Sequence, residues 1–226
     1  MTTPNHKIRL VMELRRSGVS DTRVLAAMEK VPRELFCLPQ FRDRAYEDTA
    51  LPIEHGQTLS QPSVVGLMTQ ALELGPRMKV LEVGTGSGYQ AAVLAKLGRR
   101  VYTIERHKPL LLEAEQRFRE LRITNIVTLA GDGWKGWPEQ APFDRIMVTA
   151  APPEIPAALV EQLAVGGTMV APVGREKATQ RLLKLLKTET GVVSEDIIPV
   201  RFVPMVEGMP EEQAPFSAGN AGKRHG

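Results

Sequence analysis

Residues 80–89 read VLEVGTGSGY: an apolar, strand-like run carrying one acid, Glu82, leads directly into three glycines at alternate positions. Gln90 then opens an apolar segment with helical character. In doubly wound α/β folds the ligand lies beyond the carboxyl end of the first strand, where a tight glycine turn lets it approach the backbone. The stretch therefore predicts the first strand–loop–helix unit of a ligand-binding sheet.

The spacing of the glycines distinguishes between ligands. A dinucleotide fingerprint, G-x-G-x-x-G, requires its third glycine at position 89, which is Tyr89 here. The loop is instead G-x-G-x-G, with Glu82 two residues before Gly84. A carboxylate at that place would repel a pyrophosphate but attract a cation. S-adenosylmethionine fits this pattern, because it carries a sulfonium and an ammonium group and no phosphate.

Two further acids follow the next predicted strands. Glu105 ends the second strand, twenty-one residues after Gly84, where a carboxylate can accept both hydrogens of a ribose. Asp132 follows the third strand and can accept from an adenine amino group. Taken singly, each acid could equally be a helix cap or a turn former. Together, acids at the ends of three consecutive strands predict a methyl-donor site.

The rest of the chain supports a doubly wound α/β fold with a mostly parallel sheet. Strands are predicted at 80–83, 101–104, 126–129, 146–149 and 168–173. Helical segments between most of them, including 88–97 and 107–121, predict βαβ units with helices on both faces. Two final runs, 182–187 and 197–203, leave no room for a crossover helix and predict an antiparallel hairpin at the sheet edge.

Residues 1–60 predict a helical and irregular extension before the Rossmann-like core of residues 61–206. Two amphipathic helices are expected, the second capped by Ser20 or Asp21. The expected inward-facing residues are Ile8, Val11 and Met12 in the first helix and Val24, Leu25 and Met28 in the second. A proline-rich stretch follows, and a third helix should begin at Ser60 or Gln61.

Composition narrows the class of protein. The 226 residues are 42% hydrophobic and 24% charged, which is typical of a globular protein. No apolar run approaches the roughly 18 residues needed to cross a bilayer, and no secretory signal opens the chain. The single cysteine, Cys37, fits a reducing compartment. We expect one cytoplasmic domain over residues 1–206 and a flexible tail over residues 207–226.

Charge patterning argues against nucleic acid or membrane partners. The net charge is +3, the basic residues are scattered, and aromatic residues make up only 5% of the chain. Dedicated nucleic-acid binders gather basic residues on one face and interleave aromatic ones. With no exposed apolar stripe evident in the sequence, a monomer is expected.

Several motifs along residues 8–206 resemble those of the protein-L-isoaspartate O-methyltransferase family, which belongs to the class I S-adenosylmethionine-dependent methyltransferases. They are VPRELF (31–36), AY (45–46), LPI (51–53), GQTLSQP (56–62), LEVGTGSGYQ (81–90), GDG (131–133), PFD (142–144), VTAA (148–151), PVG (172–174) and RFVP (201–204). The glycine loop alone indicates only a class I methyltransferase. The GQTLSQP segment and the Val203-Pro204 ending are more specific, and they carry the substrate class.

The resemblance implies a repair enzyme that methylates the free α-carboxylate of L-isoaspartyl residues in damaged proteins. The methyl ester would close to a succinimide and reopen partly to aspartate, leaving S-adenosylhomocysteine. By the matching motifs, Ser60 is the active-site serine and also contacts substrate, together with Val203 and Pro204. The expected cofactor-binding residues are Gln57, Thr58, Leu59, Glu82, Gly84, Thr85, Gly86, Gly88, Glu105, Arg106, Asp132 and Gly133.

The chemistry requires little beyond positioning. A carboxylate acceptor is already ionised at neutral pH, since its pKa is near about 3.5–4, so no general base is needed. No His/Cys/Asp cluster has the spacing of metal ligands, and no metal is expected. The Ser60 hydroxyl can orient an anion without adding charge. The alternative that Ser60 is only the N-cap of the following helix stays open.

Three other functions are weighed against this one. A class I methyltransferase for RNA or a small molecule is the nearest, although residues 149–153, TAAPP, lack the polar residue and aromatic typical of nucleobase amino-group methylation. A nicotinamide-dependent oxidoreductase is disfavoured by Tyr89 and Glu82. A non-catalytic binding module would not need all three acids and the glycine loop.

Overall fold

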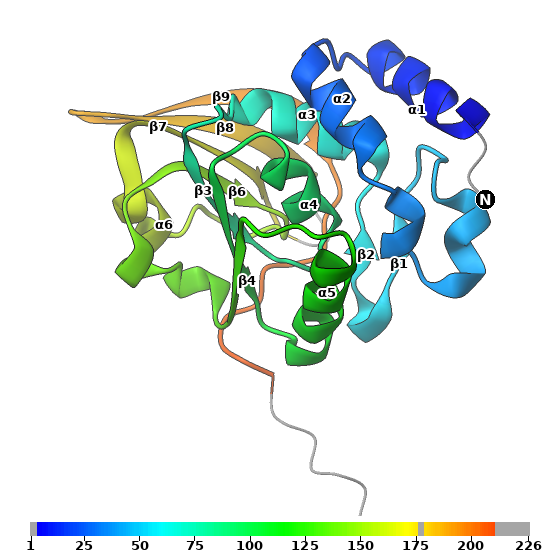
Figure 1. Ribbon diagram of the computed structural model, residues 1–226. Helices are drawn as coiled ribbons and strands as arrows, with labels where there is room; N and C mark the ends of the chain where they lie inside the picture. The colour runs from blue at the N-terminus through cyan, green and yellow to red at the C-terminus, as the bar shows by residue number, and fades with distance from the viewer. Residues whose placement is uncertain (1–3, 176–178, 211–226) are drawn as a thin grey trace, which may run out of the picture.

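The computed structural model describes residues 4–175 and 179–210 (Figure 1). Its main sheet is formed by β3 (Lys79–Val83), β4 (Arg100–Glu105), β5 (Ile126–Ala130), β6 (Phe143–Val148), β7 (Leu163–Val173), β8 (Gln180–Thr188) and β9 (Gly191–Val200). The strand order is β5-β4-β3-β6-β7-β8-β9. A separate two-stranded sheet pairs β1 (Leu51–Pro52) with β2 (Thr58–Leu59).

The sheet has the predicted mixture of parallel and antiparallel pairs. The strands from β5 to β7 are parallel to their neighbours, and β7, β8 and β9 pair antiparallel at one edge. The mostly parallel sheet and the edge hairpin are therefore confirmed. Several predicted strands begin too late: β6 begins at Phe143 rather than 146, β7 at Leu163 rather than 168, β8 at Gln180 rather than 182, and β9 at Gly191 rather than 197. The predicted end of β9, residue 203, was also wrong, because the strand ends at Val200. Residues 191–196 of β9 are exposed, so the first part of this edge strand lacks the apolar pattern used to recognise strands.

Helices cover both faces of the sheet. They are α1 (Pro4–Arg16), α2 (Thr22–Lys30), α3 (Pro62–Leu72), α4 (Tyr89–Ala95), α5 (Lys108–Glu120) and α6 (Ala157–Gln162). Short 3-10 helices are η1 (Arg33–Phe36), η2 (Pro39–Arg44), η3 (Glu54–Gly56), η4 (Gly133–Lys135) and η5 (Pro138–Gln140). In Figure 1, α6 lies on the opposite side of the sheet from α4 and α5.

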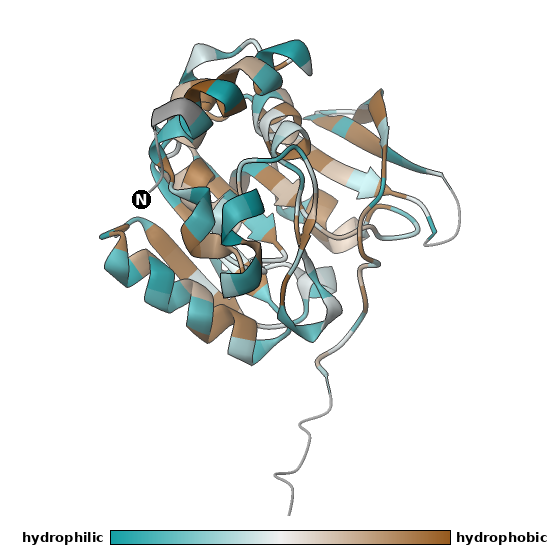
Figure 2. Cartoon of the chain, turned by 90° about the vertical axis from the view of Figure 1, so that its right-hand side faces the viewer, coloured by the Kyte–Doolittle hydropathy of each residue, from teal (hydrophilic) through white to brown (hydrophobic). Residues whose placement is uncertain are grey.

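The two faces of β3 separate the two halves of the core. Val80 packs in the cluster that includes α3, α4 and α5, whereas Leu81 and Val83 point to the cluster that includes Leu159 of α6. This alternation is what a strand buried on both faces produces. Figure 2 shows the surface helices changing between brown and teal along their length, as expected for helices with one buried face.

The first helix faces the core differently from the prediction. Leu10 and Leu14 are each 1% exposed, whereas Ile8 and Met12 are 56% and 50% exposed. The predicted face was therefore wrong in these two residues. The buried stripe runs through positions 7, 10, 11 and 14, which repeat at helical spacing and face α2 and α3. Ile8 and Met12 lie next to this stripe on the helix surface and remain exposed to solvent.

The second and third helices largely follow the predictions. Val24, Leu25 and Met28 are buried, and Asp21 is the N-cap of α2, since its carboxylate accepts from the Arg23 N–H. The third helix begins at Pro62, with Gln61 at the N-cap position. Within the described residues, no helix is long and apolar enough to cross a membrane. The tail predicted from residue 207 lies outside the described residues from residue 211 onward.

Candidate active site

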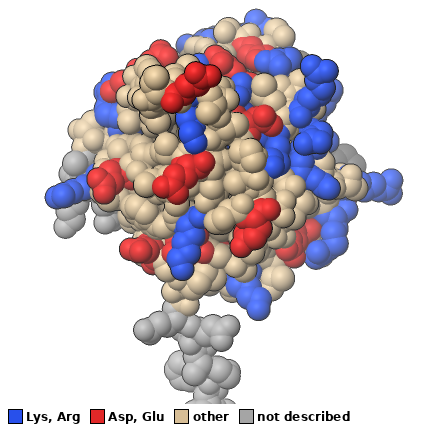
Figure 3. All heavy atoms as spheres, turned by 90° about the vertical axis from the view of Figure 1, so that its left-hand side faces the viewer, with Lys and Arg blue, Asp and Glu red and all other residues tan. Residues whose placement is uncertain are grey.

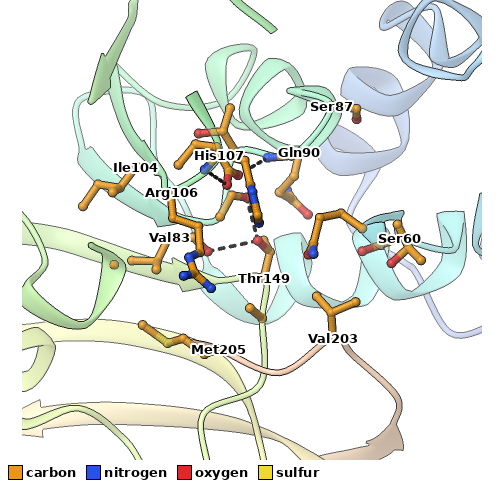
Figure 4. Close-up of a pocket in the computed structure, with 18 of the residues that line it drawn as sticks. Ser60, Val83, Ser87, Gln90, Ile104, Arg106, His107, Thr149, Val203 and Met205 are labelled. Carbon is orange, nitrogen blue, oxygen red and sulfur yellow. Dashed lines mark hydrogen bonds between the residues drawn. The ribbon is translucent and has the colours of Figure 1, made fainter. Parts of the chain in front are cut away.

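A cavity opens at the carboxyl ends of β3, β4 and β6 (Figure 4). In that view Ile104 and Arg106 lie on one side of it, while Ser60 and Val203 lie on the other. Twelve of the residues predicted from the sequence line this cavity: Gln57, Thr58, Leu59, Ser60, Gly84, Thr85, Gly86, Glu105, Arg106, Gly133, Val203 and Pro204. Segments far apart in the sequence therefore meet where parallel strands end.

Three predicted cofactor residues, Glu82, Gly88 and Asp132, do not line the cavity. Gly88 is the N-cap of α4 at φ +91°, and a Cβ there would lie 2.8 Å from the Phe118 ring. Its lack of a side chain therefore lets α5 pack closely against the loop. The Asp132 carboxylate accepts from the Trp134 N–H and so caps η4, next to the cavity residue Gly133.

Glu82 is placed beneath the glycine loop rather than at the cavity surface. Its side chain is fully buried, and Oε2 accepts a hydrogen bond from the Thr103 hydroxyl, which also bonds the Thr85 hydroxyl. Burial raises the pKa of this carboxyl to about 8, and Glu105 acts in the same direction. The sequence predicted a carboxylate that faces a cationic ligand, but the Glu82 side chain does not line the cavity. Glu82 instead joins a buried polar network behind the loop.

The glycine loop is held closely against the end of β6. Gly84 has φ +97°, and a Cβ there would lie 2.4 Å from the Thr149 hydroxyl oxygen. That hydroxyl is within hydrogen-bonding distance of the Gly84 and Val83 carbonyl oxygens, at 2.6 and 3.0 Å. A positive φ and this close approach both require glycine at position 84. The exposed backbone of the loop then forms one wall of the cavity.

Glu105 presents its carboxylate to the same cavity. Its Oε2 accepts from the Gly86 N–H at 2.8 Å, and its Oε1 accepts from the His107 N–H at 2.9 Å. Each carboxylate oxygen has a second lone pair, so Glu105 can still accept from two further donors. This is the pattern expected of an acid that holds a pair of vicinal hydroxyl groups.

His107 was expected at the surface but lines the cavity. Its ring stacks on that of His55, with centroids 5.1 Å apart, so the segment before β2 contacts the segment after β4. Partial burial lowers the pKa of His107; Glu105 opposes this shift, while His55 and Arg106 add to it. The neutral imidazole is therefore favoured at this place.

The surroundings of Ser60 show whether this residue caps α3. The N-cap position of α3 is Gln61, not Ser60. Asp48 provides the capping carboxylate, accepting from the Ser63 N–H at 2.8 Å and from the Gln61 side-chain amide at 2.9 Å. The alternative that Ser60 is the N-cap of this helix is therefore wrong. Its half-buried side chain is left to line the cavity.

An extended segment near the carboxyl end of the described chain completes the wall beside Ser60. The Ala151 N–H donates to the Val203 carbonyl, and the Met205 N–H donates to the Ala151 carbonyl. This bridge ties residues 203–205 to the residues that follow β6. Val203 consequently lies on the same side of the cavity as Ser60 (Figure 4).

Eleven lining residues were not among the predicted site residues: Val65, Val83, Ser87, Tyr89, Gln90, Ile104, His107, Thr149, Ala150, Met205 and Val206. Eight of them lie within two residues of a predicted one, so extending each predicted segment by two residues would have found them. The other three are different: Thr149 and Ala150 follow β6, from which no site residue was predicted, and Val65 is brought to the cavity by the packing of α3. Over the described residues, no group of three or more His, Cys, Asp or Glu side chains could hold a metal ion.

Nearly the whole chain is similar to proteins of one known family. The family model described as protein-L-isoaspartate(D-aspartate) O-methyltransferase matches residues 5–210. The chain belongs to this family. Proteins named protein-L-isoaspartate O-methyltransferase are similar to it: that of Rhodospirillum centenum is 62% identical over 94% of this chain and 96% of the relative. That of Paramagnetospirillum magneticum is 65% identical over 91% of this chain and 96% of the relative.

Solved structures of the family share the fold. One protein-L-isoaspartate O-methyltransferase has a TM-score of 0.79 and 31% identity, covering 88% of this chain and 65% of that longer one. A Plasmodium falciparum structure assigned to the same activity has a TM-score of 0.78 and 28% identity over 90% of this chain and 99% of that one. That protein was solved in complex with S-adenosyl-L-homocysteine. Family membership thus excludes the dinucleotide-binding alternative and gives the Rossmann-like methyltransferase fold.

Proposed function

We propose that this chain is a protein-L-isoaspartate O-methyltransferase that repairs damaged proteins and peptides. It transfers a methyl group from S-adenosylmethionine to the free α-carboxylate of an L-isoaspartyl residue, and the ester then closes to a succinimide that reopens partly to aspartate. One observation carries the proposal: a single cavity joins Ser60 and Val203 to the glycine loop and Glu105. The family membership of the chain supplies the substrate class.

The cofactor side of the cavity fits a cationic nucleoside. When bound, S-adenosylmethionine supplies an electrophilic methyl group on a sulfonium. Glu105 can still accept hydrogen bonds from two ribose hydroxyls. Gly84 and Gly86 line the cavity without side chains, so a ligand can lie close to the backbone of the loop. The proposed cofactor contacts are Gln57, Thr58, Leu59, Gly84, Thr85, Gly86, Glu105, Arg106 and Gly133. Glu82, Gly88 and Asp132 act from behind, by shaping the loops that make these contacts.

The substrate side has only to bind and orient an anion. The acceptor carboxylate is ionised at neutral pH, so no side chain needs to remove a proton. The Ser60 hydroxyl donates a hydrogen bond that points one carboxylate oxygen at the methyl group. Val203 and Pro204 lie in an extended segment that offers backbone groups to the peptide. Exclusion of water favours the step, because a carboxylate and a sulfonium neutralise each other.

The remaining assignments concern the chain as a whole. Residues 1–206 form one methyltransferase unit, monomeric and cytoplasmic, whose partners are isoaspartyl proteins rather than nucleic acids or membranes. On the face that Figure 3 shows, basic side chains gather along one edge, and acidic ones are spread between and beside them. On this face the acidic side chains interrupt the basic ones, unlike the uniformly basic face of a dedicated nucleic-acid site.

A matched pair of peptides tests the function. Two peptides identical except for one residue, L-isoaspartyl in one and L-aspartyl in the other, are incubated with the protein and S-adenosylmethionine. Methyl ester and S-adenosylhomocysteine should form with the isoaspartyl peptide alone. Ser60→Ala should lower kcat strongly and leave the melting temperature unchanged, because Asp48 caps α3.

The outcomes separate the alternatives. Equal methylation of both peptides, or of neither, would refute the isoaspartyl specificity. Transfer to RNA in a parallel reaction, with neither peptide methylated, would favour the rival methyltransferase. Unchanged kcat in Ser60→Ala would remove that residue from the mechanism without touching the substrate assignment.

A further inference from the structure

Arg33 is a buried arginine outside the cavity, in η1. Its side chain is 0% exposed, and it is among the largest side chains buried to that extent. Among the described residues, no carboxylate lies within ion-pair distance of its guanidinium. Burial lowers the pKa of Arg33, and Tyr89, Cys37 and Asp48 oppose the shift. A buried charge without an ion pair is unfavourable unless hydrogen bonds offset the loss of its hydration.

The guanidinium contacts three separate segments. Nε donates to the Ala45 carbonyl at 2.8 Å, and Nη2 donates to the Ser60 carbonyl at 2.7 Å. Its carbon lies 4.8 Å from the centre of the Tyr89 ring, in the geometry of a cation–π contact. Tyr89 is the first residue of α4 and lines the cavity next to the glycine loop.

These contacts span the two sides of the site. Ser60 belongs to the substrate side, and Tyr89 belongs to the loop that approaches the cofactor. Phe36 packs edge-on against Tyr89, with ring centroids 5.5 Å apart, and so fixes the ring on which Arg33 lies. The planar fork of a guanidinium can bind two carbonyls and a ring face at once, which a lysine cannot do. Arg33 therefore sets the distance between the Ser60 backbone and the glycine loop.

We propose that Arg33 is a positioning residue for methyl transfer, acting through Ser60. Resting on the proposed function, this role means that Arg33 holds the serine hydroxyl where its hydrogen bond can direct an oxygen of the acceptor carboxylate at the methyl group. The acceptor oxygen, the methyl carbon and the sulfur must be collinear in the transition state. A small displacement of Ser60 therefore lowers kcat more than it weakens the binding of the cofactor. A misplacement of about 1 Å far from the reacting atoms can lower a rate by roughly 100-fold.

The test uses two variants of Arg33 and a matched control. Arg33→Met keeps the apolar length but removes all donors, and Arg33→Lys keeps the charge but not the fork. Arg145 provides the control, because it is 9% exposed and also bonds backbone carbonyls, those of Glu73 and Asp144. It lies on β6 beside Val80, near the amino end of the strand and away from the cavity. Arg145→Met therefore reports what loss of a buried arginine does to stability alone.

Four quantities are measured for each full-length variant: kcat and KM for the isoaspartyl peptide, the Kd of S-adenosylhomocysteine, and the melting temperature. Arg33→Met should lower kcat roughly 10- to 100-fold, with little change in the Kd. Arg33→Lys should fall between Arg33→Met and the wild type. Arg145→Met should lower the melting temperature and leave kcat at the wild-type value.

Several results would overturn the proposal. One is a stability loss in Arg33→Met equal to that of Arg145→Met, with kcat retained; another is a Kd that weakens in step with kcat, since Arg33 would then support the whole site. If Arg33→Met does not fold, wild-type kcat in Arg33→Lys overturns the role, and reduced kcat with retained Kd supports it. An inactive wild type would refute the proposed function first, whereas an active wild type with unaffected variants refutes only Arg33.

Discussion

The two sides of the cavity are built in different ways. The cofactor side consists of the ends of β3 and β4 and the loops that follow, held by the parallel ladder of a sheet. The substrate side has Ser60 and residues 203–204 in its wall and is backed by short 3-10 helices and by two strands of two residues each. The second of these strands, β2, also carries the proposed cofactor contacts Thr58 and Leu59. Buried and half-buried polar side chains hold those short elements: Arg33 binds two carbonyls, Asp48 caps α3, and the Tyr46 hydroxyl donates to Glu34.

This difference has consequences for substitution. On the cofactor side the backbone itself is the critical part, because a Cβ at Gly84 would clash with Thr149 and both Gly84 and Gly86 have positive φ. On the substrate side individual side-chain hydrogen bonds replace regular secondary structure, and each can be removed singly. Changes on the cofactor side should therefore be large and should affect folding and binding together. Changes on the substrate side should be smaller and should separate stability from turnover.

The largest effect is expected for Gly84→Ala. The backbone there has φ +97°, and the new Cβ would lie 2.4 Å from the Thr149 hydroxyl oxygen. Backbone strain of about 1–3 kcal/mol and overpacking of about 1–3 kcal/mol should together lower the free energy of unfolding by roughly 2–6 kcal/mol. Binding of S-adenosylhomocysteine should be lost as well. Urea unfolding and calorimetric titration measure the two effects.

Gly56→Ala is the matched control for backbone strain. Gly56 also has positive φ, at +66°, but a Cβ there would meet nothing within 4 Å. Only the strain remains, about 1–2 kcal/mol. Equal destabilisation of the two variants would show that the contact with Thr149 is unimportant, and the cofactor side would then not depend on a closely packed backbone.

On the cofactor side, Glu82 should make the stability of the protein depend on pH. Burial raises the pKa of its carboxyl to about 8, from 4.5 in the absence of the fold, so the folded state binds an extra proton between these values. The free energy of unfolding contributed by Glu82 is therefore fully present below about pH 4.5. It declines as the pH rises towards 8, by at most about 1.4 kcal/mol per unit. Glu82→Gln, which resembles the protonated form, should lack this decline.

The measurement is urea unfolding of both proteins from pH 5 to pH 8.5. Glu82→Gln should match the wild type near pH 5 and exceed it by roughly 3–4 kcal/mol near pH 8. A wild-type advantage that grows with pH would mean that the buried carboxyl is ionised in the folded protein. Glu82 would then be held by unrecognised positive charge rather than by the neutral network of Thr103 and Thr85.

The same contrast explains what the sequence could predict. Strand ends, glycine spacing and the acid at Glu105 follow from periodicity along a few residues, and the sheet brings them together automatically. The burial of Glu82 could not be predicted in the same way. Alternation along β3 shows on which face of the sheet the side chain lies, but not which residues cover that face. The burial of Leu10 and Leu14 instead of Ile8 and Met12 depends on where α2 and α3 pack. The first turns of α1 are compatible with either face.

Long-range polar contacts were the least predictable feature. Nothing near Ser60 in the sequence indicates that Asp48, thirteen residues before Gln61, caps the helix. Nor does the motif of residues 31–36 reveal that Arg33 binds the Ser60 carbonyl. Such contacts depend on how irregular segments fold back on each other, for which no periodic pattern exists. Arg33 lies within one of the family motifs and Asp48 within none of them, and at neither position do the neighbouring residues show what the side chain contacts.

The smallest expected effect concerns Asp48, and it tests whether substrate-side contacts separate stability from turnover. Asp48→Ala removes the cap of α3 and frees the Gln61 side chain. The free energy of unfolding should fall by about 1 kcal/mol, the usual value of an N-cap. Because Ser60 directly precedes this helix end, kcat for the isoaspartyl peptide should also fall several-fold. Asp48→Asn keeps an acceptor oxygen and should retain most of both.

Asp21→Ala is the control, because Asp21 caps α2 by accepting from the Arg23 N–H, and it is not among the residues that line the cavity. Its stability loss should resemble that of Asp48→Ala while kcat stays at the wild-type value. If both variants lose stability and neither loses turnover, the end of α3 does not position Ser60. The geometry of the substrate side would then depend on the Arg33 contact alone, so that Asp48 would be a capping residue with no part in catalysis.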